Sequence, residues 1–252
     1  MKLLLVNGNR TESVTRTVLD EARAAAGPGT DCRAVTAAFG ADVVHGHAED
    51  VVAAHAVLDA IARAGPCDAV IIAISFDSGL AAARELLDVP VYGITESALA
   101  TAAQRGRRIG VITFGQGSRR LYEDVFARSG SAVHIAQVRT LDIASTDAYL
   151  TPLAQDERVV AAAHELAQGG AEAVAVCGAA VSGIARRIGA RVPVPLFDGV
   201  ACAVARAKGA VRGAEADPAG TTTLPARHAG PHAVMAGLSP ELTALFARRG
   251  AA

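Results

Sequence analysis

The sequence has almost no net charge and no long apolar run. Lys and Arg number 24 against 25 Asp and Glu, and the formal net charge is −1. Without a Lys- or Arg-rich block, the chain lacks the electrostatic footprint of a nucleic-acid-binding protein. The apolar opening reaches the polar Asn7 too early for a secretory segment or a membrane span. We therefore expect a first buried strand there, a cytoplasmic protein, and neither a nucleic acid nor a membrane as partner.

The sequence also lacks the spacing of metal ligands. Its four cysteines form no C-x-x-C or Cys/His pattern, and no two of its seven histidines stand four residues apart beside a carboxylate. We therefore predict no metal site and four free thiols, which suit a reducing compartment. The cysteines are Cys32, Cys67, Cys177 and Cys202.

What the chain does have is a regular alternation of short Val- and Ile-rich runs with longer Ala-rich stretches. This order, in a chain that is 51% hydrophobic, predicts an α/β fold with mainly parallel strands and helices on both sheet faces. We expect strands near residues 2–6, 31–36, 68–74, 90–93, 108–113, 132–138, 172–177 and 193–197. Helices are expected near residues 11–26, 48–64, 79–87, 95–105, 117–129, 152–168, 181–189 and 198–208.

The elements divide into two pseudo-symmetric lobes, each with a four-stranded sheet. We assign residues 1–107 to lobe 1 and residues 108–208 to lobe 2, with a crossover near 104–108. The segment from about 209 to 252 returns to lobe 1; it begins with turn and coil residues and ends in a short helix capped by Ser239. We expect the active site in the cleft between the lobes.

A half-site occurs twice in the sequence. Residues 68–80 run on to Val89, Pro90 and Val91, and residues 172–183 run on to Val192, Pro193 and Val194. Counted back from the two prolines, Cys177 corresponds to Ile74, with Ser75 beside it. We therefore interpret the two half-sites as mirrored halves of one site, in which only the second half, with Cys177, carries a thiol.

Ligands of parallel α/β proteins bind beyond the carboxyl ends of the strands, where loops converge and helix amino-termini present free N–H groups. Such loops could hold the oxygen of a carboxylate or an enolate. Asparagines, serines and threonines in them are equally well explained as turn or capping residues. The candidate substrate-binding residues are Asn7, Asn9, Ser78, Gly79, Thr113, Gly178 and Ala179, and Ser75 is a candidate for catalysis.

Cys177 is the first candidate for catalysis. It ends an apolar strand and precedes Gly178 at the start of an expected helix, where a thiolate is favoured. Such a position could lower the pKa of the thiol from about 8.5 toward neutrality. The alternative is that Cys177 is a small buried hydrophobe. Cys202 looks structural, and Cys32 and Cys67 have no helper groups nearby.

At these residues the chain resembles the aspartate/glutamate/hydantoin racemase superfamily, most closely its hydantoin and allantoin racemase branch. The matching stretches are residues 5–11 with Ser13 and Thr15, 76–85, 89–96, 108–113, 177–180, 192–194 and 237–242. The resemblance implies two cysteines, one per lobe, that remove and return a proton on a stereogenic carbon without a cofactor. Only Cys177 matches, because the family's other cysteine falls at Ile74.

The resemblance predicts a cofactor-independent racemase or epimerase acting at a carbon next to a carbonyl, with Cys177 as acid and base. Its substrate would be hydantoin- or amino-acid-like, a carboxylate or a cyclic ureide, and the enzyme a homo-oligomer. Ser75 could take the missing role, but an alcohol is a far weaker acid than a thiol. The alternative is a decarboxylase of a malonate-type substrate, since the single thiol also resembles arylmalonate decarboxylases.

Two further classes stay open. Residues 7–15 are similar to the phosphate loop of flavodoxin-like FMN reductases. With no tryptophan and three tyrosines, however, the chain offers little aromatic cover for a flavin ring. The other class is a catalytically inactive binding protein that kept the cleft after losing a thiol at position 74.

Overall fold

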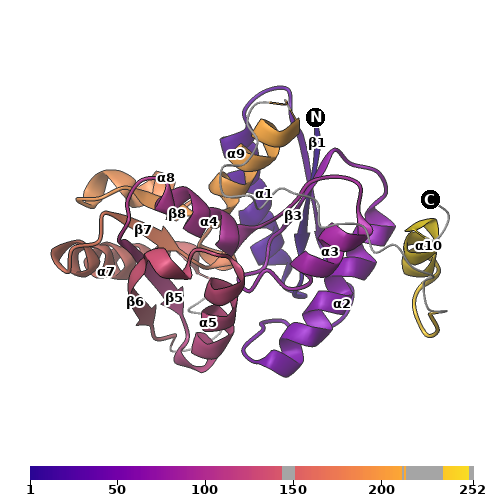
Figure 1. The fold of residues 1–252 in the computed structure, drawn as a ribbon, viewed down its shortest axis with the longest axis horizontal. Coiled ribbons are helices and arrows are strands. Elements are labelled where there is room, and N and C mark those ends of the chain that lie inside the picture. The colour runs from indigo at the N-terminus through magenta and orange to yellow at the C-terminus, as the bar shows by residue number, and fades with distance from the viewer. Residues whose placement is uncertain (144–150, 212, 214–234, 250–252) are drawn as a thin grey trace.

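The computed structural model describes residues 1–143, 151–211, 213 and 235–249. They form two four-stranded sheets, ordered β2-β1-β3-β4 and β6-β5-β7-β8, which lie in two lobes (Figure 1). Every strand pair is parallel, so the α/β class and the paired sheets are confirmed. The strands are β1 (Lys2–Asn7), β2 (Asp31–Thr36), β3 (Ala69–Ile72), β4 (Val91–Gly93), β5 (Ile109–Phe114), β6 (Ile135–Leu141), β7 (Ala173–Val176) and β8 (Leu196–Asp198).

One central strand of each sheet, β3 or β7, is apolar along its whole length, as suits a sheet with helices on both faces. All four residues of β3 and of β7 are buried, as expected for Val- and Ile-rich parallel strands. The helices are α1 (Glu12–Ala26), α2 (His47–Ala64), α3 (Leu80–Leu86), α4 (Ile94–Ala103), α5 (Arg119–Arg128), α7 (Asp156–Gln168), α8 (Ile184–Ile188), α9 (Gly199–Val211) and α10 (Pro240–Arg249). Short 3₁₀ turns include η1 (Gln116–Ser118) and η4 (Ala179–Val181).

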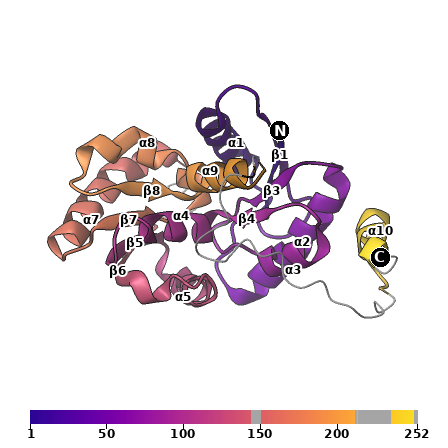
Figure 2. The same ribbon diagram turned by 45° about the horizontal axis from the view of Figure 1, so that its top comes forward.

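The last helix of each lobe packs against the sheet of the other lobe. From α4, Leu99 packs in one cluster with Val111 and Ala175 of the second sheet. From α9, Val204 packs with Leu5 and with α1 of the first lobe, and Figure 2 shows α9 lying between the lobes. The structure thus places α9, which we expected in lobe 2, in the core of lobe 1. The chain returns at Gly199 rather than near residue 209, because the apolar face of α9 completes the layer that α1 begins.

The carboxyl-terminal helix is confirmed where it was expected. The Ser239 hydroxyl accepts the Leu242 N–H at 3.2 Å, which is the predicted N-cap. Leu242 is buried, and α10 packs against α2 and α3. Of the predicted turn and coil segment before this helix, residues 212 and 214–234 lie outside the described residues, and residues 209–211 belong to α9. In the described part of the chain, no helix combines the length and the apolar character that crossing a membrane requires.

Candidate active site

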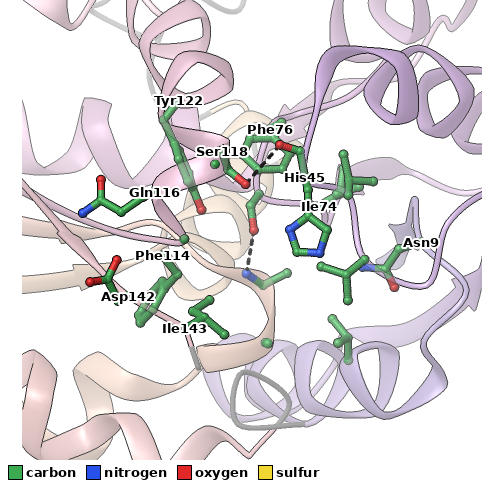
Figure 3. A pocket seen from close by; sticks show the side chains of 18 residues that line it. Asn9, His45, Ile74, Phe76, Phe114, Gln116, Ser118, Tyr122, Asp142 and Ile143 are labelled. Carbon is green, nitrogen blue, oxygen red and sulfur yellow. Dashed lines mark hydrogen bonds between the residues drawn. The ribbon is translucent and has the colours of Figure 1, made fainter. Parts of the chain in front are cut away.

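A pocket of about 480 Å³ lies between the two lobes (Figure 3). Its walls come from the carboxyl ends of the strands, where a parallel sheet collects its loops. Lobe 1 contributes Asn9 after β1, residues 43–45 before α2 and residues 74–76 after β3. Lobe 2 contributes residues 114–118 after β5, residues 142–143 after β6 and residues 179–180 after β7. The predicted cleft between the lobes is therefore present.

The pocket combines apolar walls with neutral polar groups. Ile74, Phe76 and Phe114 supply apolar surface, while amides and hydroxyls come from Asn9, Gln116, Ser75 and Ser118. Among the described lining residues there is no lysine or arginine, and one carboxylate, Asp142, is present. This lining suits an uncharged polar ring better than an anion, because an anion would lack a cationic partner.

Ser75 joins the two lobes at the pocket wall. Its hydroxyl oxygen accepts the backbone N–H of Ala179 at 3.1 Å, across 104 residues of sequence. No described residue accepts the Ser75 O–H itself, so this donor is available to a molecule in the pocket. A neutral donor held by a buried backbone contact is suited to a carbonyl oxygen or an enolate.

The loop that carries Ser75 is fixed to the first turn of α4. Thr95 donates its hydroxyl to the Ser75 carbonyl at 2.6 Å. Asp77 accepts the backbone N–H groups of Thr95 at 3.0 Å and Glu96 at 2.8 Å, which caps the helix. Burial, and then repulsion from Glu96, raise the pKa of Asp77 to about 8. Glu96 is itself paired with Arg84.

Cys177 lies beneath the pocket rather than in its wall. Its side chain is 2% exposed and belongs to an apolar cluster that includes residues of the second sheet, α4, α5 and lobe 1. Burial, and then the nearby Asp77, raise the pKa of the thiol above its ordinary value. The predicted lowering of this pKa is wrong, because desolvation outweighs any effect of the following helical turn. The Cys177 carbonyl, not the thiol, accepts the hydroxyl of the pocket residue Tyr122 at 2.9 Å.

The sheet register corrects the correspondence between the two half-sites. Ile72 pairs with Val6 of β1, and Val176 pairs with Ile112 of β5. The next residues, Ala73 and Cys177, donate their N–H groups to those two central-strand carbonyls at 2.8 and 2.9 Å. Cys177 therefore corresponds to Ala73, not to Ile74.

The glycines that precede α3 and α8 confirm this register. Gly79 (φ 77°) and Gly183 (φ 83°) both have left-handed backbone. Gly79 lies five residues after Ile74, and Gly183 lies five residues after Gly178. Counting back from the prolines failed because Pro90 corresponds to Pro195 and not to Pro193: the carbonyls of Pro90 and Pro195 accept the N–H groups of the equivalent residues Val70 and Val174, each at 2.9 Å. Neither Ile74 nor Gly178 carries a group that can exchange a proton.

The other predicted residues divide between the pocket and its support. Asn9 and Ala179 line the pocket together with Ser75. Asn7 lies behind them, donating its amide to Asn9 at 2.9 Å and to Thr15 at 3.0 Å. Thr113 bonds Thr140 across the sheet, and Ser78 bonds Asp50. Gly79 is the N-cap of α3, and Gly178 lies against Phe114; neither is among the described pocket residues.

Sequence reasoning missed most of the pocket wall. Although the neighbouring Thr113 was a candidate, the lining residues that were not selected include His45, Phe114, Gln116, Ser118, Tyr122 and Asp142. The available signal for His45 was a histidine between an expected strand and an expected helix. In the described part of the chain, no three His, Cys, Asp or Glu side chains are grouped as a metal site would require.

Comparison with known proteins adds a family match over most of the chain. Residues 3–207 match the family model described as Asp/Glu/Hydantoin racemase. A hydantoin racemase of Rhizobium meliloti is 32% identical over 82% of this chain and 88% of its own length. A hydantoin racemase of Paenarthrobacter aurescens is 28% identical over 81% of this chain and 89% of its own.

Solved structures agree with the sequence relatives. An allantoin racemase from Pseudomonas fluorescens is 34% identical, with a TM-score of 0.81 over 93% of this chain and 100% of its own. One from Klebsiella pneumoniae is 28% identical, with a TM-score of 0.83 over 96% of this chain and 98% of its own. An unliganded arylmalonate decarboxylase, 16% identical with a TM-score of 0.56 over 83% of this chain and 92% of its own, shares the fold.

Proposed function

Because the chain belongs to the Asp/Glu/hydantoin racemase family, we propose that it is a racemase whose substrate is a cyclic ureide of the hydantoin type. The reaction removes a proton from the ring carbon next to a carbonyl and returns one to the opposite face. The observation that carries the proposal is the pocket between the lobes, where the Ser75 hydroxyl has no described acceptor and the described lining residues include no lysine or arginine.

The pocket groups fit the needs of this reaction. Removal of the proton moves negative charge onto the carbonyl oxygen, and a positioned donor stabilises that charge. Ser75 supplies such a donor on a backbone that Thr95 and Asp77 hold rigidly. The amides of Asn9 and Gln116 can pair with the N–H and C=O groups of a ureide ring.

The alternatives fit the pocket less well. A substituted malonate or an acidic amino acid carries carboxylates that would face Asp142 without a cation among the described lining residues. The likeness to arylmalonate decarboxylase shows the fold alone. The FMN reductase alternative is overturned by the family match and by the two four-stranded sheets, since a flavodoxin-like protein has a single sheet.

The acid and base role of Cys177 stays a prediction, and its burial speaks against direct contact with a pocket ligand. Independence from a cofactor, assembly into a homo-oligomer and a cytoplasmic location are likewise proposals that rest on the resemblance.

The proposal is tested with a panel of enantiopure substrates. We expect 5-substituted hydantoins to lose optical rotation in the presence of the enzyme, and arylmalonates to release no carbon dioxide. Polarimetry and carbon dioxide release are followed in parallel, with heat-denatured protein as control. Carbon dioxide release with formation of one enantiomer would show a decarboxylase and contradict the proposal. No reaction with any of the substrates would favour a binding protein.

A further inference from the structure

The corrected register leaves the described pocket wall without a thiol. Ile74 and Gly178 occupy the equivalent positions of the two half-sites, and Cys177 lies beneath the wall. Racemisation still needs a group that accepts and returns a proton at carbon. Among the described lining residues, the titratable side chains are His45, Tyr122 and Asp142. Tyr122 already donates its hydroxyl to the Cys177 carbonyl.

We propose that the imidazole of His45 exchanges the proton of the substrate, an inference that rests on the racemase function proposed above. Figure 3 shows the His45 ring among the side chains that line the pocket, on the side where Asn9 and Ile74 also lie. Its nitrogens make no hydrogen bond with a described residue and are therefore available to a ligand. Imidazole is the side chain most often used as both acid and base.

The backbone holds His45 in place from both lobes. The Glu49 carboxylate accepts the N–H groups of His45 at 2.8 Å and Gly46 at 2.7 Å, which fixes the start of α2. From lobe 2, the Ser118 hydroxyl donates to the His45 carbonyl at 3.3 Å. The position of the ring thus depends on both lobes, as expected for a group that works at their junction.

The step balances without a further reactant. A neutral imidazole nitrogen takes the proton from the ring carbon, and the C–H electron pair moves into the carbonyl to give an enolate, whose oxygen accepts the Ser75 O–H. The imidazolium then returns a proton to either face of the planar enolate, and the C–H bond forms again. A pocket of about 480 Å³ leaves a five-membered ring room to turn over between the two events. Two charged groups face the imidazole: Glu49 in the first turn of α2 interacts with His45, and Asp142 lines the same pocket.

The test compares His45→Gln with a matched control, His47→Gln. Glutamine keeps a polar side chain but cannot exchange a proton. We expect kcat for a hydantoin to fall by about 10³-fold in His45→Gln, within the range for loss of a general acid and base. His47 is exposed, pairs with Asp124 and lies outside the pocket, so His47→Gln should match the wild type. Because the His45 side chain is exposed, its variant should fold, which circular dichroism checks.

Deuterium uptake gives a second readout, which a merely structural role would not produce. One base that serves both faces puts solvent deuterium into the recovered substrate and the product at comparable early rates. Two bases on opposite faces of the ring would instead put deuterium into the product before it enters the recovered substrate. We expect label in both enantiomers with wild type and with Cys177→Ala, and in neither with His45→Gln.

Different results would contradict the role of His45 and the racemase function. Full activity in His45→Gln, or loss of activity in Cys177→Ala with that protein folded, would overturn the assignment and leave the racemase function standing. A wild-type enzyme that racemises no hydantoin would overturn both.

Discussion

Replacing Ser75 with alanine is expected to lower kcat for a hydantoin by about 10²-fold, the usual cost of removing one donor to a developing oxyanion. The hydroxyl accepts the Ala179 N–H from lobe 2 and is free to donate into the pocket, so it is held in position before substrate binds. Because the donor acts most strongly on the enolate, KM should change less than kcat. Steady-state racemisation rates at several substrate concentrations measure both constants.

A matched control separates this role from a structural one. Ser129 is a partly buried serine whose hydroxyl donates to the Phe126 carbonyl, away from the pocket. Ser129→Ala should therefore keep the wild-type rate. Ser75→Ala also leaves the Ala179 N–H without its acceptor, which costs about 1–3 kcal/mol of stability. A normal kcat in folded Ser75→Ala would remove Ser75 from the reaction.

Replacing Asp77 with alanine is expected to lower the free energy of unfolding by about 3 kcal/mol. The substitution removes the cap of α4 and leaves the buried N–H groups of Thr95 and Glu96 without acceptors. Asp77 also has a left-handed backbone (φ 51°), which alanine tolerates less well than aspartate. Denaturant unfolding measures the loss, and Asp124→Ala on the exposed surface is the control.

The raised pKa of Asp77 gives this prediction a pH dependence. Burial raises the pKa from 3.8 to about 8, so between these values the folded chain binds more protons than the unfolded chain. The contribution of Asp77 to stability is therefore complete below about pH 4 and is lost as the pH rises toward 8. Asp77→Asn, which stays neutral, should show a smaller decline over that range. An identical decline in both proteins would mean that Asp77 is ionised throughout.

Much of the fold could be predicted because parallel strands buried on both faces produce unmistakable apolar runs. The expected strand at 31–36 agrees with β2, and the expected helix at 48–64 differs from α2 by one residue. The placement of α9 could not be predicted, since an apolar helix face fits either lobe equally well. Only the three-dimensional packing shows that α9 covers the sheet of lobe 1.

The site was harder to predict because side-chain direction depends on single-residue register. Strand-end loops were located correctly, and Ser75 and Asn9 do face the pocket. The expected role of Cys177 depended on an interval counted back from Pro193, but Pro195 is the proline that corresponds to Pro90. The resulting error of one residue places the thiol on the opposite face from the one expected. His45 could not be selected from sequence, because nothing in a lone loop histidine shows that it faces the other lobe.

The most direct measurement is a crystal structure with a 5,5-disubstituted hydantoin, which has no hydrogen at the reacting carbon and cannot turn over. We expect the ring to bind between the lobes, with a carbonyl oxygen within hydrogen-bond distance of the Ser75 hydroxyl and the reacting carbon beside the His45 imidazole. A ring bound elsewhere, or a reacting carbon in contact with the Cys177 sulfur, would contradict this expectation.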